Sequence, residues 1–83
     1  MTYNEAYVKA KEVKENIDNC TEHENGFIFG CSDDDKYIGG GGHVPVVVLK
    51  DSGNVVNLPY FLTHGAGKEI RSFKIAPDGT IKE

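Results

Sequence analysis

The sequence predicts an α+β domain in which one N-terminal helix packs on an antiparallel sheet of about four strands. Three observations support this fold class. An amphipathic helical pattern opens the chain, several later stretches alternate or are rich in β-branched residues, and a turn-forming segment joins two of those stretches. The chain has 83 residues, which suffice for one helix on one sheet. We therefore expect residues 1–83 to form a single small domain.

The helix is predicted from its cap and its periodicity. Thr2 followed by Glu5 has the form of a capping box, in which each side chain accepts from a free backbone N–H at the helix start. Apolar residues then recur at helical spacing. These residues are Tyr3, Ala6, Tyr7, Ala10, Val13 and Ile17. We expect the helix to end near Asp18 or Asn19, with a loop over residues 20–26.

The first two strands are predicted from their side-chain patterns. Residues 27–31 alternate, which places Phe27, Phe29 and Cys31 on one face of a strand. Residues 44–49 are β-branched and apolar on both faces, as is typical of a strand that is covered on both sides. Pro45 lacks an N–H donor, and we therefore place it at the beginning of this strand.

Turn residues divide the second half of the chain. Asp51 and Ser52 suit a type I turn, which Gly53 closes in the left-handed conformation, so residues 54–58 return as the partner strand. Residues 60–67 are predicted to be a loop or a single helical turn. Residues 70–76 alternate again, and a Pro-Asp-Gly turn leads to a final short segment over residues 80–83.

The run of four glycines at residues 39–42 is interpreted as a hinge. A phosphate-binding loop requires a helix after its glycines and a Lys-Ser/Thr pair, whereas here His43, Pro45 and a strand follow. Glycine supplies the backbone freedom that a bulged strand entry needs. The sequence therefore predicts no nucleotide or other cofactor at this run.

The cysteines and histidines are the residues of this chain most suited to metal binding or catalysis. Cys20, His23, Cys31 and His43 are a possible Cys₂His₂ zinc set, but their spacing is irregular and Cys31 follows the alternation of a strand. No nucleophile–base pair or paired-acid motif is evident. We expect reduced thiols, no metal, no cofactor and no enzymatic activity.

The charge distribution points to a protein partner. The net charge is −4, and residues 1–36 carry nine acids against four lysines. Such a field repels nucleic acid and attracts basic surfaces. The longest apolar run is far shorter than a membrane span, and the N-terminus lacks the apolar block of a secretory signal, so we expect a cytoplasmic protein that does not bind membranes.

Two acidic loops form the predicted partner-binding site. They flank the strand at residues 27–31 and combine negative charge with one aromatic anchor. The residues are Glu22, Glu24, Asp33, Asp34, Asp35 and Tyr37. Tyr60 and Phe61, which also fall in a predicted loop, suit the same anchoring role.

Two segments resemble the YrhB-like immunity-protein family of bacterial polymorphic toxin systems. Residues 1–10 match its N-terminal Thr-Tyr-x-x-Ala helix, and residues 42–58 match its strand pair, in which an apolar run meets an Asp-x-Gly turn. The resemblance implies a small cytoplasmic protein that binds and neutralises a cognate toxin. Since the chain is acidic, we expect a basic toxin domain that is inhibited by occlusion. The alternative is a small structural or chaperone-like module that associates through a sheet edge.

Overall fold

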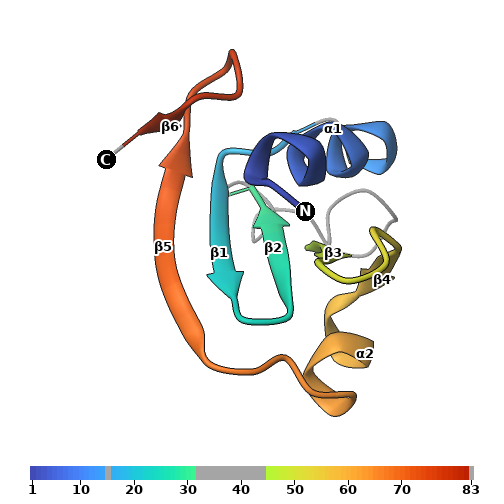
Figure 1. Ribbon diagram of the computed structural model, residues 1–83. Helices are drawn as coiled ribbons and strands as arrows, with labels where there is room; N and C mark the ends of the chain where they lie inside the picture. The colour runs from blue at the N-terminus through green and yellow to red at the C-terminus, as the bar shows by residue number, and fades with distance from the viewer. Residues whose placement is uncertain (15, 32–44, 83) are drawn as a thin grey trace.

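The computed structural model describes residues 1–14, 16–31 and 45–82. These residues form two helices and one antiparallel sheet (Figure 1), which confirms the α+β class. The elements in chain order are α1 (Tyr3–Val13), β1 (Asn19–His23), β2 (Gly26–Gly30), β3 (Val46–Leu49), β4 (Val55–Asn57), α2 (Leu58–Thr63), β5 (Glu69–Ile75) and β6 (Ile81–Lys82).

The sheet has six strands in the order β4-β3-β2-β1-β5-β6, so the expected count of about four strands was wrong. The main addition is β1, which lies in the stretch predicted to be a loop. It pairs with β2 through a tight turn at Glu24 and Asn25, and with β5 on its other side. A segment with little apolar character therefore forms one of the central strands.

Helix α1 begins as predicted and ends earlier than predicted. Its capping box is present, with the Glu5 N–H donating to Thr2 Oγ1 at 3.3 Å and the Thr2 N–H donating to the Glu5 carboxylate at 3.0 Å. The helix ends at Val13 because Lys14 adopts an extended conformation while its N–H still donates to the Ala10 carbonyl. Ile17 is buried as expected, but it belongs to the crossing segment that leads into β1.

The predicted hairpin is confirmed. Strands β3 and β4 pair in antiparallel register, and Gly53 closes the turn with φ of 74°. Pro45 directly precedes β3. The neighbouring residues Val47 and Val48 are both fully buried on opposite faces, as the doubly apolar pattern predicts.

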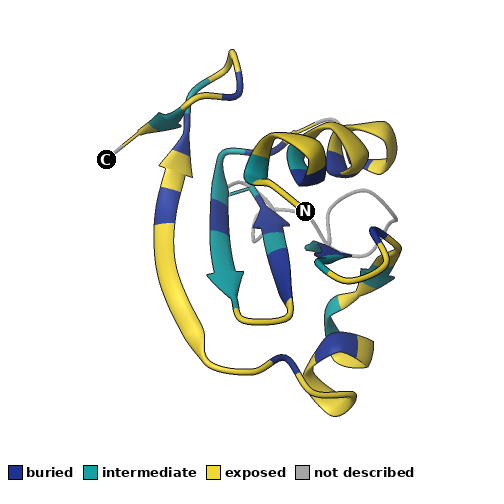
Figure 2. Cartoon of the chain, viewed as in Figure 1, coloured by how far each residue is buried: buried dark blue, intermediate teal, exposed yellow. Residues whose placement is uncertain are grey.

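The sheet separates two hydrophobic clusters. The larger one lies under α1 and consists of Ala6, Ala10, Ile17, Cys20, Phe27, Phe29, Val48, Phe73 and Ile75. The smaller one lies under α2 on the other face and consists of Val47, Phe61 and Ala66. In Figure 2 burial is concentrated in β2, β3 and the inner side of α1, while most of β5 is exposed.

Several sequence predictions lie outside the described residues. They concern Asp33, Asp34, Asp35, Tyr37, His43 and the glycine hinge at residues 39–42. Among the described residues, no helix has the length and apolar character needed to cross a membrane.

Candidate partner-binding site

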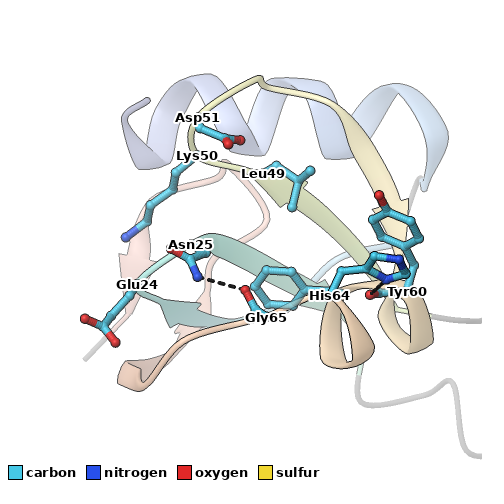
Figure 3. Close-up of a pocket in the computed structure, with 9 residues that line it drawn as sticks. Glu24, Asn25, Leu49, Lys50, Asp51, Tyr60, His64 and Gly65 are labelled. Atoms are coloured by element: carbon cyan, nitrogen blue, oxygen red, sulfur yellow. Dashed lines mark hydrogen bonds between the residues drawn. The ribbon is translucent and has the colours of Figure 1, made fainter.

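An open groove of about 490 Å³ lies between the two hairpin turns and α2 (Figure 3). The β1–β2 turn contributes Glu24 and Asn25, and the beginning of the β3–β4 turn contributes Lys50 and Asp51. The remaining lining residues are Leu49, Tyr60, Phe61, His64 and Gly65. Ligand sites commonly occupy about 300–1,000 Å³, so the groove is large enough for side chains of a partner.

Helix α2 supplies an aromatic wall to the groove. Asn57 caps this helix, because its side-chain oxygen accepts from the Tyr60 N–H at 2.8 Å. Tyr60 and His64 lie one turn apart, and their rings stack with centroids 3.9 Å apart and planes inclined by 13°. His64 Nδ1 also lies 2.9 Å from the Tyr60 carbonyl oxygen. The wall is thus held in place within the free protein.

Phe61 anchors α2 to the sheet. Its side chain is 2% exposed and belongs to the cluster with Val47, so the expectation that Phe61 serves as an exposed interface anchor was wrong. Helical periodicity explains this, since Phe61 points into the sheet while Tyr60 and Leu62 are 44% and 58% exposed.

The β1–β2 turn holds the loop that follows α2. Asn25 Nδ2 donates to the Gly65 carbonyl at 2.8 Å, and the Asn25 N–H donates to the Ala66 carbonyl at 3.2 Å. Glu24 accepts from the Lys68 N–H at 2.8 Å through one carboxylate oxygen. These bonds fix the position of the β1–β2 turn against residues 65–68, at one side of the groove. In the described contacts, no lysine or arginine side chain pairs with the Glu24 carboxylate.

Glu22 lies in β1 and is held by two cations. Its carboxylate accepts from Lys50 Nζ at 2.7 Å and from Arg71 Nε at 2.9 Å. Burial alone raises the pKa of Glu22, but the hydrogen bonds and positive charges of Lys50 and Arg71 outweigh it and lower this pKa. The negative charge of Glu22 is therefore balanced within the fold.

The two described members of the predicted acidic patch are placed differently. Glu24 lines the groove, whereas Glu22 lies in the ion-pair cluster with Lys50 and Arg71. The other predicted members, Asp33, Asp34, Asp35 and Tyr37, lie outside the described residues. The lining residues that were not assigned from the sequence are Asn25, Leu49, Lys50, Asp51, His64 and Gly65. An aromatic residue and a histidine four positions apart were the available signal for the Tyr60–His64 pair.

Cys20 and His23 lie on opposite faces of the sheet. Cys20 is buried in the cluster under α1, whereas the His23 ring packs edge-on against Phe61 in the cluster on the other face. Burial, followed by the nearby charge of Glu22, raises the pKa of the Cys20 thiol to about 12, so the thiol is protonated at neutral pH. Cys20 and Cys31 do not form a disulfide. Within residues 1–14, 16–31 and 45–82, no three His, Cys, Asp or Glu side chains are grouped to hold a metal ion.

Comparisons with protein families, with curated proteins and with solved structures found no match to this chain.

Proposed function

We propose that this chain is an immunity-type protein that binds a cognate bacterial toxin and neutralises it by occlusion. The observation that carries the proposal is the surface formed by α2, where Tyr60 lines the groove and Leu62 is exposed on the same helix. Aromatic and aliphatic side chains around a concave site are the usual anchors of protein interfaces. The resemblance of residues 1–10 and 42–58 to immunity proteins indicates that the partner is a toxin.

Charge supports a basic partner. The chain carries a net charge of −4, and acidic side chains accelerate association with a basic domain while apolar anchors slow its release. The predicted acidic patch remains part of the proposal. Glu24 belongs to it through the groove, and Asp33, Asp34 and Asp35 belong to it by sequence.

The direct test uses the toxin domain itself. We expect the reading frame beside the gene for this chain to encode a larger protein with a C-terminal toxin domain. Expression of that domain alone should arrest growth, and co-expression of this chain should restore it. Growth arrest that persists in the presence of folded chain at equal abundance would show that the proposal is wrong.

The surface on α2 is tested with a matched pair of variants. Leu62→Ser and Val8→Ser each replace an aliphatic side chain of similar exposure, 58% for Leu62 and 59% for Val8. Val8 lies on α1, away from the proposed surface, and serves as the control. Leu62→Ser should weaken toxin binding about tenfold in calorimetric titration, because interface anchors contribute 1–2 kcal/mol or more. Val8→Ser should leave the affinity unchanged. Equal effects of the two variants would remove α2 from the interface.

The acidic patch is tested separately by charge reversal. Replacement of Asp33, Asp34 and Asp35 by lysine should slow association with the toxin domain, and the difference from the unmodified chain should shrink as salt is added. Circular dichroism serves as the control for folding. An association rate that does not change would remove these three residues from the proposed patch.

A second candidate function, association through a sheet edge, is favoured by one observation. Strand β6 pairs only with Lys74 and Ile75, so the outer edge of β5 has no described partner strand along Glu69–Phe73. Light scattering during size-exclusion chromatography distinguishes the candidates. Stable self-association favours the edge-binding module, whereas a monomer that forms one tight complex with the toxin domain favours the immunity protein.

A further inference from the structure

We propose that the groove receives a cationic side chain, arginine or lysine, that projects from the partner protein. This inference rests on the proposed function and deepens it, because it names the chemical group that the site recognises. Three properties of the groove support it: an apolar floor, a fixed aromatic wall and carboxylates whose charge is not balanced inside the groove.

The floor and the wall suit the long stem of such a side chain. Leu49 is partly exposed in the groove and offers aliphatic surface, while the buried ring of Phe61 supports the groove from beneath. Arginine and lysine pack their methylene groups on such surface while the charged end stays in contact with polar groups. Figure 3 shows Leu49 between Asp51 and the two rings of Tyr60 and His64.

The aromatic wall attracts a cation without reorganisation. His64 stacks on the Tyr60 ring at 3.9 Å, and Tyr60 nevertheless remains 44% exposed. A cation near the face of an aromatic ring is attracted by the negative potential of that face. Because the ring is already held, little side-chain freedom is lost on binding.

The charges select the sign of the ligand. Asp51 and Glu24 both line the groove, and the described contacts give neither of them a basic side chain. The lining cation, Lys50, has its ammonium 2.7 Å from Glu22 and 4.9 Å from the Phe27 ring centroid, which belongs to the cluster under α1. The charge of Lys50 is therefore neutralised by Glu22. The remaining charge in the groove is the negative charge of Asp51 and Glu24, which disfavours an acidic ligand.

The test uses short peptides, so it does not depend on the toxin. Acetyl-Gly-Arg-Gly-amide is titrated into the full ¹⁵N-labelled chain, with lysine, norleucine and glutamate peptides of the same length in parallel. We expect saturable shifts of the Leu49, Asp51, His64 and Gly65 amide resonances with the arginine or lysine peptide. The norleucine and glutamate peptides should leave these resonances in place.

Two substitutions test the carboxylates. Asp51→Asn keeps the size and the turn preference of the side chain, and it should weaken arginine-peptide binding roughly threefold, as expected for one exposed ion pair. Adding Glu24→Gln should weaken binding further. The control Glu12→Gln removes an exposed carboxylate from α1 and should change nothing. Unaltered spectra elsewhere in each variant verify the fold.

The inference is overturned if the shifts are scattered over the surface, if norleucine binds as well as arginine, or if Asp51→Asn and Glu12→Gln behave alike. Its failure is separable from failure of the proposed function. Growth protection by the chain without groove-specific peptide binding would leave the immunity function in place and reject the groove as the recognition element.

Discussion

Glu22 shows how a polar side chain is accommodated in a central strand. It lies between Lys50, from the β3–β4 turn, and Arg71, from β5, and its side chain is 15% exposed. The two cations also pack over aromatic rings, with Lys50 Nζ 4.9 Å from the Phe27 centroid and Arg71 Cζ 4.7 Å from the Phe73 centroid. The carboxylate therefore links three parts of the sheet that are distant in sequence.

Glu22→Gln should destabilise the fold by about 1–2 kcal/mol at pH 7, because Lys50 and Arg71 lose their shared countercharge. The pKa of Glu22 is lowered in the folded state, so its contribution is present above the ordinary value of 4.5 and is lost as the pH falls through the lowered pKa. Urea unfolding at pH 7 and pH 3 measures this, and the stability difference between the two proteins should be smaller at pH 3 than at pH 7. Glu12→Gln is the control, and an equal loss of stability in that variant would contradict the assignment.

Gly79 and Gly65 allow the cost of a steric clash to be separated from the cost of a left-handed backbone. Both have positive φ, 93° and 97°, but a Cβ at Gly79 would lie 2.7 Å from Tyr7 Cε2, whereas a Cβ at Gly65 meets no atom within 4 Å. Gly65→Ala should therefore cost only about 1–2 kcal/mol for the left-handed backbone. Gly79→Ala should cost a further ~1–3 kcal/mol for the clash. Chemical denaturation compares the two, and equal losses would show that the Tyr7 contact does not matter.

At the scale of elements, β1 explains why the strand count was wrong. Cys20 is the one fully buried side chain of β1, so the strand lacks the apolar alternation from which strands are predicted. Its polar side chains find partners only after folding. Glu22 pairs with two cations, Thr21 Oγ1 lies 3.3 Å from Ser72 Oγ, and His23 Nδ1 lies 3.2 Å from the Gly67 carbonyl oxygen.

Strand β5 has an edge that hydrogen exchange can detect. The Ile75 N–H donates to the Asp18 carbonyl, so Phe73, two residues earlier, also directs its N–H toward β1, while Ser72 faces the outer edge. We expect the Ser72 amide to exchange on the order of a hundredfold faster than the Phe73 amide, because β6 does not extend to it.

The control for this prediction is Lys74, whose pairing with Lys82 of β6 should slow its amide exchange. Slow exchange at Ser72 in the isolated protein would mean that another strand covers the edge. That result would contradict the prediction and would favour the edge-binding module over the immunity protein.

At the scale of the whole molecule, the beginning of α1 contacts the β5–β6 turn. Tyr3 Oη, at the beginning of α1, donates to the Gly79 carbonyl of the β5–β6 turn at 2.8 Å. The Tyr3 ring also packs at centroid distances of 5.4 Å from Phe73 and 6.0 Å from Phe29. Helix α1 thus covers the larger cluster, and its first turn is hydrogen-bonded to the β5–β6 turn near the other end of the sequence. Figure 1 shows α1 and this turn at the same end of the sheet.

Tyr3→Phe should lower the free energy of unfolding by about 1 kcal/mol at pH 8, because the ring is kept and one hydrogen bond is lost. Burial, followed by the charges of Cys20 and Tyr7, raises the pKa of Tyr3 from 10 to about 12. The contribution is therefore complete below pH 10 and is lost as the pH rises toward 12.

Urea unfolding at pH 8 and at pH 11 measures the stability difference between the unmodified chain and Tyr3→Phe. The difference should be smaller at pH 11. The exposed Tyr60→Phe is the control, and its stability should match that of the unmodified chain at both values. A difference for Tyr3→Phe that grows with pH would contradict the sign of this prediction.

The candidate site was only partly predictable from the sequence. Charge composition predicted that Glu24 belongs to a partner-binding surface, and Tyr60 was predicted to be an aromatic anchor. The structure places both residues in the lining of the groove. Asp51 and His64 belong to the same groove because two hairpin turns and α2 meet at one end of the sheet. That meeting depends on strand order, which no local pattern encodes.

The sequence by itself determined the α+β class, the cap of α1, the β3–β4 hairpin with its glycine turn and the doubly buried character of β3. Each depends on local periodicity or turn chemistry, which neighbouring residues specify. Only the tertiary structure decided the position of β1, the early end of α1, the balance of Glu22 by Lys50 and Arg71, and the shape of the groove. These features arise from contacts between residues far apart in the chain, whose free energy is gained only when the whole sheet forms.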